Sequence, residues 1–167
     1  MALEVHVVPH VGPLPHIAWQ RDLETGILAG SFIVPPNDDA FTGSVELTDE
    51  DGSIVVLDVV SGVVCGLDVV MWPELVELPG LAAPVEAREG QVLVPSRAAR
   101  RGATVLEFDA ALTASTDPAA RTIHLRFGAR RAVEPIRVAD RMLLEVDAAG
   151  RLAGVWLQDL PDDSGTD

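Results

Sequence analysis

Two stretches of this chain match each other at a separation of 88 residues. Residues 53–73 read SIVVLDVVSGVVCGLDVVMWP, and residues 141–161 read RMLLEVDAAGRLAGVWLQDLP. Alignment without a gap places the apolar residues 54–56 on 142–144. It also pairs three sets of identical residues, namely Gly62 with Gly150, Gly66 with Gly154, and Pro73 with Pro161. Both stretches are rich in Val or Leu, as strands are, so the match predicts two related β units.

Short apolar or alternating segments separated by Gly, Pro and Asp predict strands along most of the chain. The expected strands cover residues 3–8, 16–20, 27–34, 44–48, 54–60, 63–70, 91–94, 104–108, 122–127, 142–146 and 152–158. Turns are expected at 61–62 and 148–150, because Gly adopts positive φ without steric cost. Ser96 as an N-cap, with Gly102 after two arginines, predicts one short helix over 96–102.

The expected fold class is mainly β (α+β with minor helix), with two related antiparallel meander or hairpin units packed as a sandwich or barrel-like pair. The first unit covers residues 1–87 and the second covers 88–161, and together they can form one compact domain. Either unit alone has too few strands to bury a core. Residues 72–85, rich in Pro and Gly, indicate a linker or covering loop. The polar residues 162–167 are expected to form a disordered tail.

Charge is distributed unevenly along a chain that has a net charge of −14 and no Lys. Residues 1–87 contain 14 acidic residues and 1 Arg, a sum of −13. Residues 88–167 contain 12 acidic residues and 11 Arg, a sum of −1. An acidic surface repels nucleic acid and anionic membranes and attracts basic proteins. We therefore expect a protein partner, with a basic one as an option, and neither nucleic acid nor a membrane.

Several sequence features bear on the compartment. Cys65 is the single cysteine, so no disulfide can form within the chain. The N-terminal residues MALEVHVVPHVGP lack the basic start of a signal peptide. No apolar run approaches the ~18 residues of a membrane-spanning helix. The absence of Lys is typical of a GC-rich bacterial genome, and we expect a bacterial cytoplasmic protein.

Residues 138–157, VADRMLLEVDAAGRLAGVWL, contain a strand, an Asp-containing turn that ends in Gly, an Arg and a second strand. This stretch resembles a small, uncharacterised bacterial domain family, the DUF2283-like family, and the first unit resembles it more weakly. Where that family tends to carry Glu after Gly-Ile, this chain has Asp68 in the first copy and Trp156 in the second. The resemblance implies a β fold in two diverged copies, and it implies no activity.

No motif in the sequence predicts a catalytic, metal or cofactor site. His6 and His10 would share one face of a strand at ~13 Å, which is too far for one metal ion. Cys65 lies in a Val-rich strand of the acidic half, where a raised thiol pKa would disfavour the nucleophilic thiolate. Residues 49–52, Asp-Glu-Asp-Gly, lack ligands of a calcium loop and indicate a charged hairpin turn.

Candidate binding residues gather in the second unit, where most of the Arg residues lie. His124 and Arg126 are expected to share the outer face of their strand, because they alternate with apolar residues. His124 is the candidate anchor of a ligand pocket. Residues 75–81 are a candidate for an exposed apolar patch that a partner would cover. Concentrated Arg can bind an anion or an acidic partner. The candidate partner-binding residues are Trp72, Trp156, Arg126, Arg130 and Arg131.

These features favour a non-catalytic protein-interaction or assembly module. One alternative is a small β-barrel enzyme or ligand-binding protein with a pocket between the two units. Another is an acidic inhibitor or immunity-type protein that masks a basic partner. No cofactor is expected, and a homodimer is one option. The module predicts an exposed apolar patch or a free sheet edge, whereas the pocket alternative predicts convergent polar groups between the units.

Overall fold

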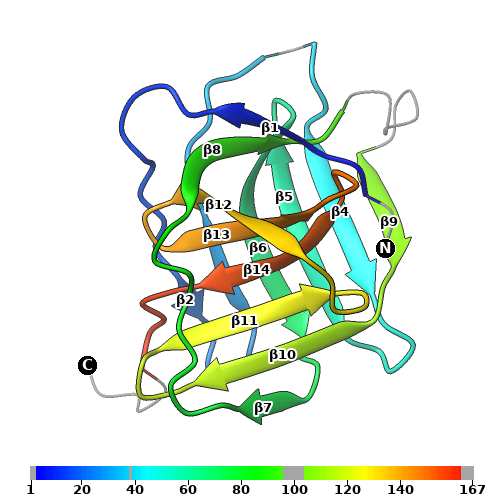
Figure 1. Cartoon of the computed structure of the whole chain (residues 1–167). Helices are drawn as coiled ribbons and strands as arrows, with labels where there is room; N and C mark the ends of the chain where they lie inside the picture. The colour runs from blue at the N-terminus through cyan, green and yellow to red at the C-terminus, as the bar shows by residue number, and fades with distance from the viewer. Residues whose placement is uncertain (1–2, 38, 96–103, 163–167) are drawn as a thin grey trace.

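Strands form the regular structure of the described residues, which are 3–37, 39–95 and 104–162 of a computed structural model (Figure 1). Within these ranges the chain forms no helix, and the mainly β fold is confirmed. The helix expected at 96–102 and residues 163–167 of the expected tail lie outside them. The strands are β1 (His6–Pro9), β2 (Gln20–Arg21), β3 (Leu28–Ser31), β4 (Gly43–Thr48), β5 (Ile54–Val60), β6 (Val63–Met71), β7 (Leu75–Glu77), β8 (Arg88–Leu93), β9 (Val105–Asp109), β10 (Leu112–Asp117), β11 (Thr122–Phe127), β12 (Val133–Ala139), β13 (Met142–Asp147) and β14 (Leu152–Leu157).

The strands form two sheets with the same pattern of neighbours. The order in the first sheet is β2-β3-β6-β5-β4-β9, and in the second sheet it is β10-β11-β14-β13-β12-β8. Within these two orders the last strand joins its neighbour in parallel and the other neighbours are antiparallel. Two strands lie outside the shared order, namely β7, which is parallel to β10, and β1, which is antiparallel to β8. Each strand of the first sheet therefore has a positional counterpart in the second.

The two sheets exchange strands across the expected boundary at residues 87 and 88. β9 comes from residues 88–161 yet completes the first sheet beside β4. β7 comes from residues 1–87 yet lies on the second sheet beside β10. Pairing of Val63 on β6 with Leu93 on β8 joins the two sheets into one hydrogen-bonded path. The two units are therefore interlocked.

The central hairpins, β5–β6 and β13–β14, contain the matching stretches found in the sequence. Gly62 and Gly150 lie in their turns with φ of 81° and 75°, as expected. Asp58 is paired with Gly66, and Glu145 is paired with Gly154. The glycines are 88 residues apart but the carboxylates are 87 apart, because the second turn is one residue longer. The ungapped alignment of 54–56 with 142–144 is therefore wrong by one residue.

A single apolar core lies between the sheets. Buried residues of the first sheet, such as Leu57 and Leu67, share this core with Leu125, Phe127 and Leu144 of the second. Figure 1 shows β10, β11, β13 and β14 crossing in front of β4, β5 and β6, an arrangement typical of sheets packed at a steep angle. Because side chains alternate along a strand, the polar residues on these strands lie on the outer faces of the sheets.

Three strands were absent from the sequence-based expectation, and one expected strand is mostly absent from the structure. β10 and β12 are additional, and residues 72–85 contain β7 within the expected covering loop. Of the expected strand at 16–20, only Gln20 lies in a strand. The part of the chain that the structure describes contains no helix with the length and apolar character to cross a bilayer.

Candidate functional site

A buried carboxylate on the outer face of the second sheet organises the main candidate site. Glu145, on β13, is 7% exposed and faces Gly154 of the neighbouring β14. A side chain at position 154 would collide with the Glu145 carboxylate and with the Leu125 carbonyl oxygen. Glycine at this position therefore lets Glu145 extend across β14 towards β11.

The Glu145 carboxylate meets two aromatic side chains beyond Gly154. Its Oε1 atom lies 2.6 Å from His124 Nε2, and its Oε2 atom accepts a hydrogen bond of 3.4 Å from Trp156 Nε1. The His124 and Trp156 rings are stacked, with centroids 4.2 Å apart. Both carboxylate oxygens are thus engaged, as a buried carboxylate requires. The sequence predicted His124 on the outer face of its strand, and on that face the structure gives it a partly buried network.

Three arginines stand beside this network. Arg131 is engaged by the fold: its guanidinium donates to Asp147 at 2.7 Å and to the carbonyl oxygens of Phe127, Ala129 and Leu152. Although burial alone raises the pKa of Asp147, hydrogen bonds from the Arg151 N–H and from Arg131 bring it below its ordinary value. Arg131 is therefore a structural cation rather than an available one.

Arg126 is different, because its Nε atom is buried and has no hydrogen-bond partner among the described residues. It extends from β11, between Thr113 of β10 and Gly154 of β14. Arg130 is exposed nearby. Together with the Glu145 network, these side chains line a pocket of about 400 Å³. The pocket is lined by Leu78, Leu81, Ser115, His124, Arg126, Ala129, Arg130, Arg131, Val133, Glu145, Ala153 and Trp156.

The structure thus brings His124, Trp156 and the three candidate arginines together in one pocket. Trp72 does not join them. It is half-buried, its indole Nε1 donates to the Gly26 carbonyl oxygen at 2.8 Å, and the Arg21 guanidinium lies 5.8 Å from its ring centroid. Glu145 was missed by sequence reasoning, although its place opposite a strand glycine is a usable signal once the register is known.

The first sheet carries an acidic counterpart at the same position. The Asp58 carboxylate lies over Gly66, and Asp68 takes the place that Trp156 has in the second sheet. Burial, and then the charge of Asp68, raises the pKa of Asp58 to about 6, and burial also raises the pKa of Asp68. These residues line a pocket of about 420 Å³. The two sheets thus present pockets of opposite charge on equivalent backbone.

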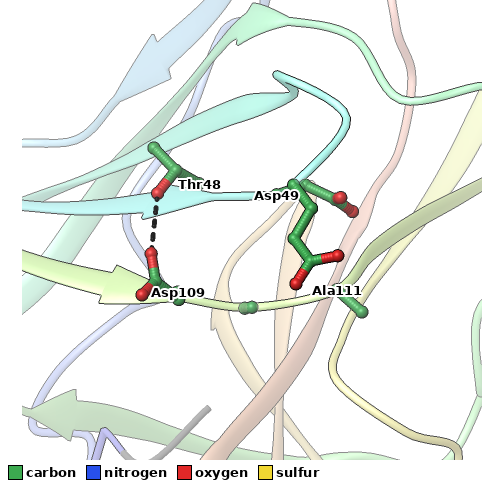
Figure 2. A pocket seen from close by; sticks show the side chains of 6 residues that line it. Thr48, Asp49, Asp109 and Ala111 are labelled. Atoms are coloured by element: carbon green, nitrogen blue, oxygen red, sulfur yellow. Dashed lines mark hydrogen bonds between the residues drawn. The ribbon is translucent and has the colours of Figure 1, made fainter.

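A second acidic hollow lies at the end of β4. Figure 2 shows Thr48 and Asp109 facing each other across it, and Thr48 Oγ1 donates to Asp109 Oδ1 at 3.4 Å. The hollow measures about 550 Å³. Asp49 accepts hydrogen bonds from the N–H groups of Leu112 and Asp51, which lower its pKa. Asp49 therefore fastens its hairpin turn to the start of β10, consistent with the charged turn expected there.

The histidines near the N-terminus and Cys65 occupy separate places. His10 Nδ1 lies 3.2 Å from the Gly12 carbonyl oxygen, and His16 Nδ1 lies 2.7 Å from Asp140 Oδ2. Within the described ranges, no group of three or more His, Cys, Asp or Glu is arranged to hold a metal ion. Cys65 is 2% exposed, and burial followed by the charge of Asp58 raises its pKa to about 11. This agrees with the raised thiol pKa that the sequence predicts for Cys65.

Comparison with known proteins adds one finding: no family model matches the chain, and no curated protein matches it at a significant level. The resemblance of residues 138–157 to the DUF2283-like family therefore stays a prediction. What the protein binds has to be inferred from the side chains described above.

Proposed function

We propose that the protein is a non-catalytic interaction module of the bacterial cytoplasm, whose protein partner adds a strand to the free edge of β7. One observation carries the proposal: β7 ends the second sheet and exposes apolar side chains. Leu75, Val76 and, just after the strand, Leu78 are 42%, 50% and 44% exposed. Free sheet edges with apolar side chains are templates for pairing with another chain.

The backbone of β7 supports this mode of binding. β10 is its single strand neighbour among the described residues, so one row of N–H and C=O groups faces away from the sheet. Leu75 and Glu77 also line a hollow of about 260 Å³, which Ile123 and Leu160 border. A partner strand can therefore gain both backbone hydrogen bonds and a side-chain contact.

The charges around β7 favour a basic partner over a second copy of this chain. Glu74 and Glu77 bracket Leu75 and Val76, and the whole chain has a net charge of −14. Pairing of two β7 strands would bring these like charges together, which is unfavourable across strands. A strand flanked by Lys or Arg would meet them with complementary charge.

The side chains best suited to catalysis are engaged elsewhere, which supports a non-catalytic role. The Cys65 thiol is buried with a pKa of about 11, far from the range of reactive thiolates. His124 and Glu145 are bound to each other. Convergent polar groups lie on the outer faces, and the space between the sheets holds the apolar core.

The matching strand orders support the further proposal that the two sheets arose by internal duplication. Both hairpins have a register shift directly after the carboxylate, between Asp58 and Val59 and between Glu145 and Val146. A bulge at the same place in two sheets is a detail that hairpin geometry alone does not require.

A random peptide library displayed on phage tests the edge, with immobilised protein as bait. We expect extended peptides rich in Lys or Arg, whose affinity Val76→Asp lowers about tenfold, or about 1.4 kcal/mol. The matched control is Val105→Asp, because Val105 is 45% exposed on β9, the edge strand of the first sheet. Equal loss in both variants, or no loss in either, would contradict the proposal.

A further inference from the structure

The pocket on the outer face of the second sheet has a surplus of available positive charge. Its one carboxylate, Glu145, is engaged by His124 and Trp156. Arg131 is held by Asp147 and by backbone carbonyl oxygens. Arg126 and Arg130 remain, and neither has an ion-pair or hydrogen-bond partner among the described residues. The pocket therefore has room for an anion and cations to receive it.

Leaving Arg126 without a hydrogen-bond partner costs more free energy than leaving the exposed Arg130 without one. A guanidinium N–H that is buried without a hydrogen bond loses its hydration with no compensation. Arg126 and Ser115 also border a neighbouring hollow that contains Asp49, Asp51 and Glu74. None of these carboxylates forms an ion pair with Arg126 within the described residues. A bound ligand would supply the missing acceptor.

Apart from Ser115, the rest of the pocket lining is apolar. Leu78 and Leu81 border it from the segment after β7, Val133 borders it from β12, and the stacked Trp156 contributes an aromatic ring. A volume of about 400 Å³ falls in the range of small-molecule sites. Apolar walls beside the available arginines select a ligand that has both an apolar body and an anionic group.

We propose that this pocket binds a small organic carboxylate with an apolar body, whose carboxylate is held by the guanidinium group of Arg126. The planar fork of Arg matches a carboxylate with two parallel hydrogen bonds. Ser115 Oγ, in the same pocket, is a second donor. The pocket shares only Leu78 with the β7 edge described above, and binding here does not depend on the proposed partner protein.

Sodium hexanoate is the probe, and the indole N–H signal of Trp156 in a ¹⁵N–¹H NMR spectrum is the readout. We expect a saturable shift with a dissociation constant of about 1 mM or below. Hexanol, which lacks the charge, and inorganic phosphate, which lacks the apolar body, should each bind about tenfold more weakly or worse. The Trp19 indole, which donates to the Arg141 carbonyl oxygen, should not shift.

Two single variants test whether Arg126 holds the carboxylate group of hexanoate. Arg126→Gln should weaken hexanoate binding about tenfold or more, whereas the matched control Arg88→Gln should leave it unchanged, because Arg88 pairs with Glu134 outside the pocket. Hexanol binding equal to hexanoate, or an unchanged affinity in Arg126→Gln, would overturn the proposal. The absence of a saturable shift of the Trp156 signal in the wild-type protein would also overturn the proposal. This measurement does not require any variant to fold.

Discussion

Asp58 and Glu145 occupy the same position in the two sheets, each directly opposite a strand glycine. Their surroundings differ beyond that glycine. Glu145 meets His124 and Trp156, whereas Asp58 meets a second carboxylate, Asp68. The same backbone therefore holds an engaged carboxylate in the second sheet and two acidic neighbours in the first. The difference in environment leads to opposite expectations for substitutions at these two sites.

Replacing Asp58 with Asn should stabilise the protein at neutral pH. Burial, and then the charge of Asp68, raises the pKa of Asp58 from 3.8 to about 6. The folded state therefore binds the proton more tightly than the unfolded state. Stability is lost as the pH rises from about 4 to about 6. Since the side chain is half-buried and solvent screens its charge, we expect Asp58→Asn to gain about 1 kcal/mol at pH 7.

Urea denaturation at pH 4, 5, 6 and 7 measures this effect. The difference between Asp58→Asn and the wild type should grow across that window and then level off. Glu107→Gln is the control, because Glu107 is exposed on a strand of the same sheet. A constant difference at all four pH values would show that the Asp58 charge is not its cause.

Gly154→Ala should destabilise the protein by about 2 kcal/mol, since a Cβ atom there would collide with the Glu145 carboxylate and the Leu125 carbonyl oxygen. The double variant with Glu145→Ala removes the first collision and should recover part of the loss. Urea denaturation of the single and double variants gives the coupling energy. Additive effects of the two substitutions would contradict the proposed contact between position 154 and Glu145.

His124→Phe should also cost about 2 kcal/mol, because Phe can keep the stack on Trp156 but leaves Glu145 without its closer partner. Adding Glu145→Gln, which removes the buried charge, should restore most of the stability. Thermal and urea unfolding test both variants. Wild-type stability in His124→Phe alone would mean that Glu145 does not depend on the imidazole.

Salt should weaken the binding of basic peptides at the β7 edge. The expected attraction comes from Glu74 and Glu77, which are exposed and therefore screened by ions. We expect the affinity of selected peptides to fall ~5-fold between low and high ionic strength, mainly through slower association. Surface plasmon resonance measures both rates. Affinity that does not change with salt would leave the apolar residues as the sole attraction.

The sequence predicted those strands whose apolar residues were dense or regularly spaced. Both central hairpins were expected, since their runs of Val and Leu flank a turn glycine. β10 was not expected, because LTASTD is largely Ser and Thr, and β12 contains Pro135, which is rare inside sheets. Each strand forms a hairpin with the next strand along the chain, β11 or β13, and pairs on its other side with the more distant β7 or β8. Local patterns contain no information about those distant partners.

The sequence could predict which residues of one strand share a face, but it could not predict which strands lie side by side at the candidate site. Alternation along β11 placed His124 and Arg126 on one face, and both line the same pocket. The contribution of Glu145 depends on the pairing of β13 with β14 and of β14 with β11. The turn that is one residue longer in the second hairpin shifts this register, so an ungapped comparison of the two copies could not align Asp58 with Glu145.

The exchange of β7 and β9 between the sheets has a consequence for how the chain can be divided. Each sheet contains a strand that the other half of the sequence supplies. A fragment ending near residue 87 would therefore lack β9, which pairs with the outer side of β4. The halves are thus expected to fold as one cooperative unit, at a rate limited by bringing distant segments together. The counterpart of β9 in the second sheet, β8, comes from that sheet's own half, so the exchange is not symmetrical between the two copies.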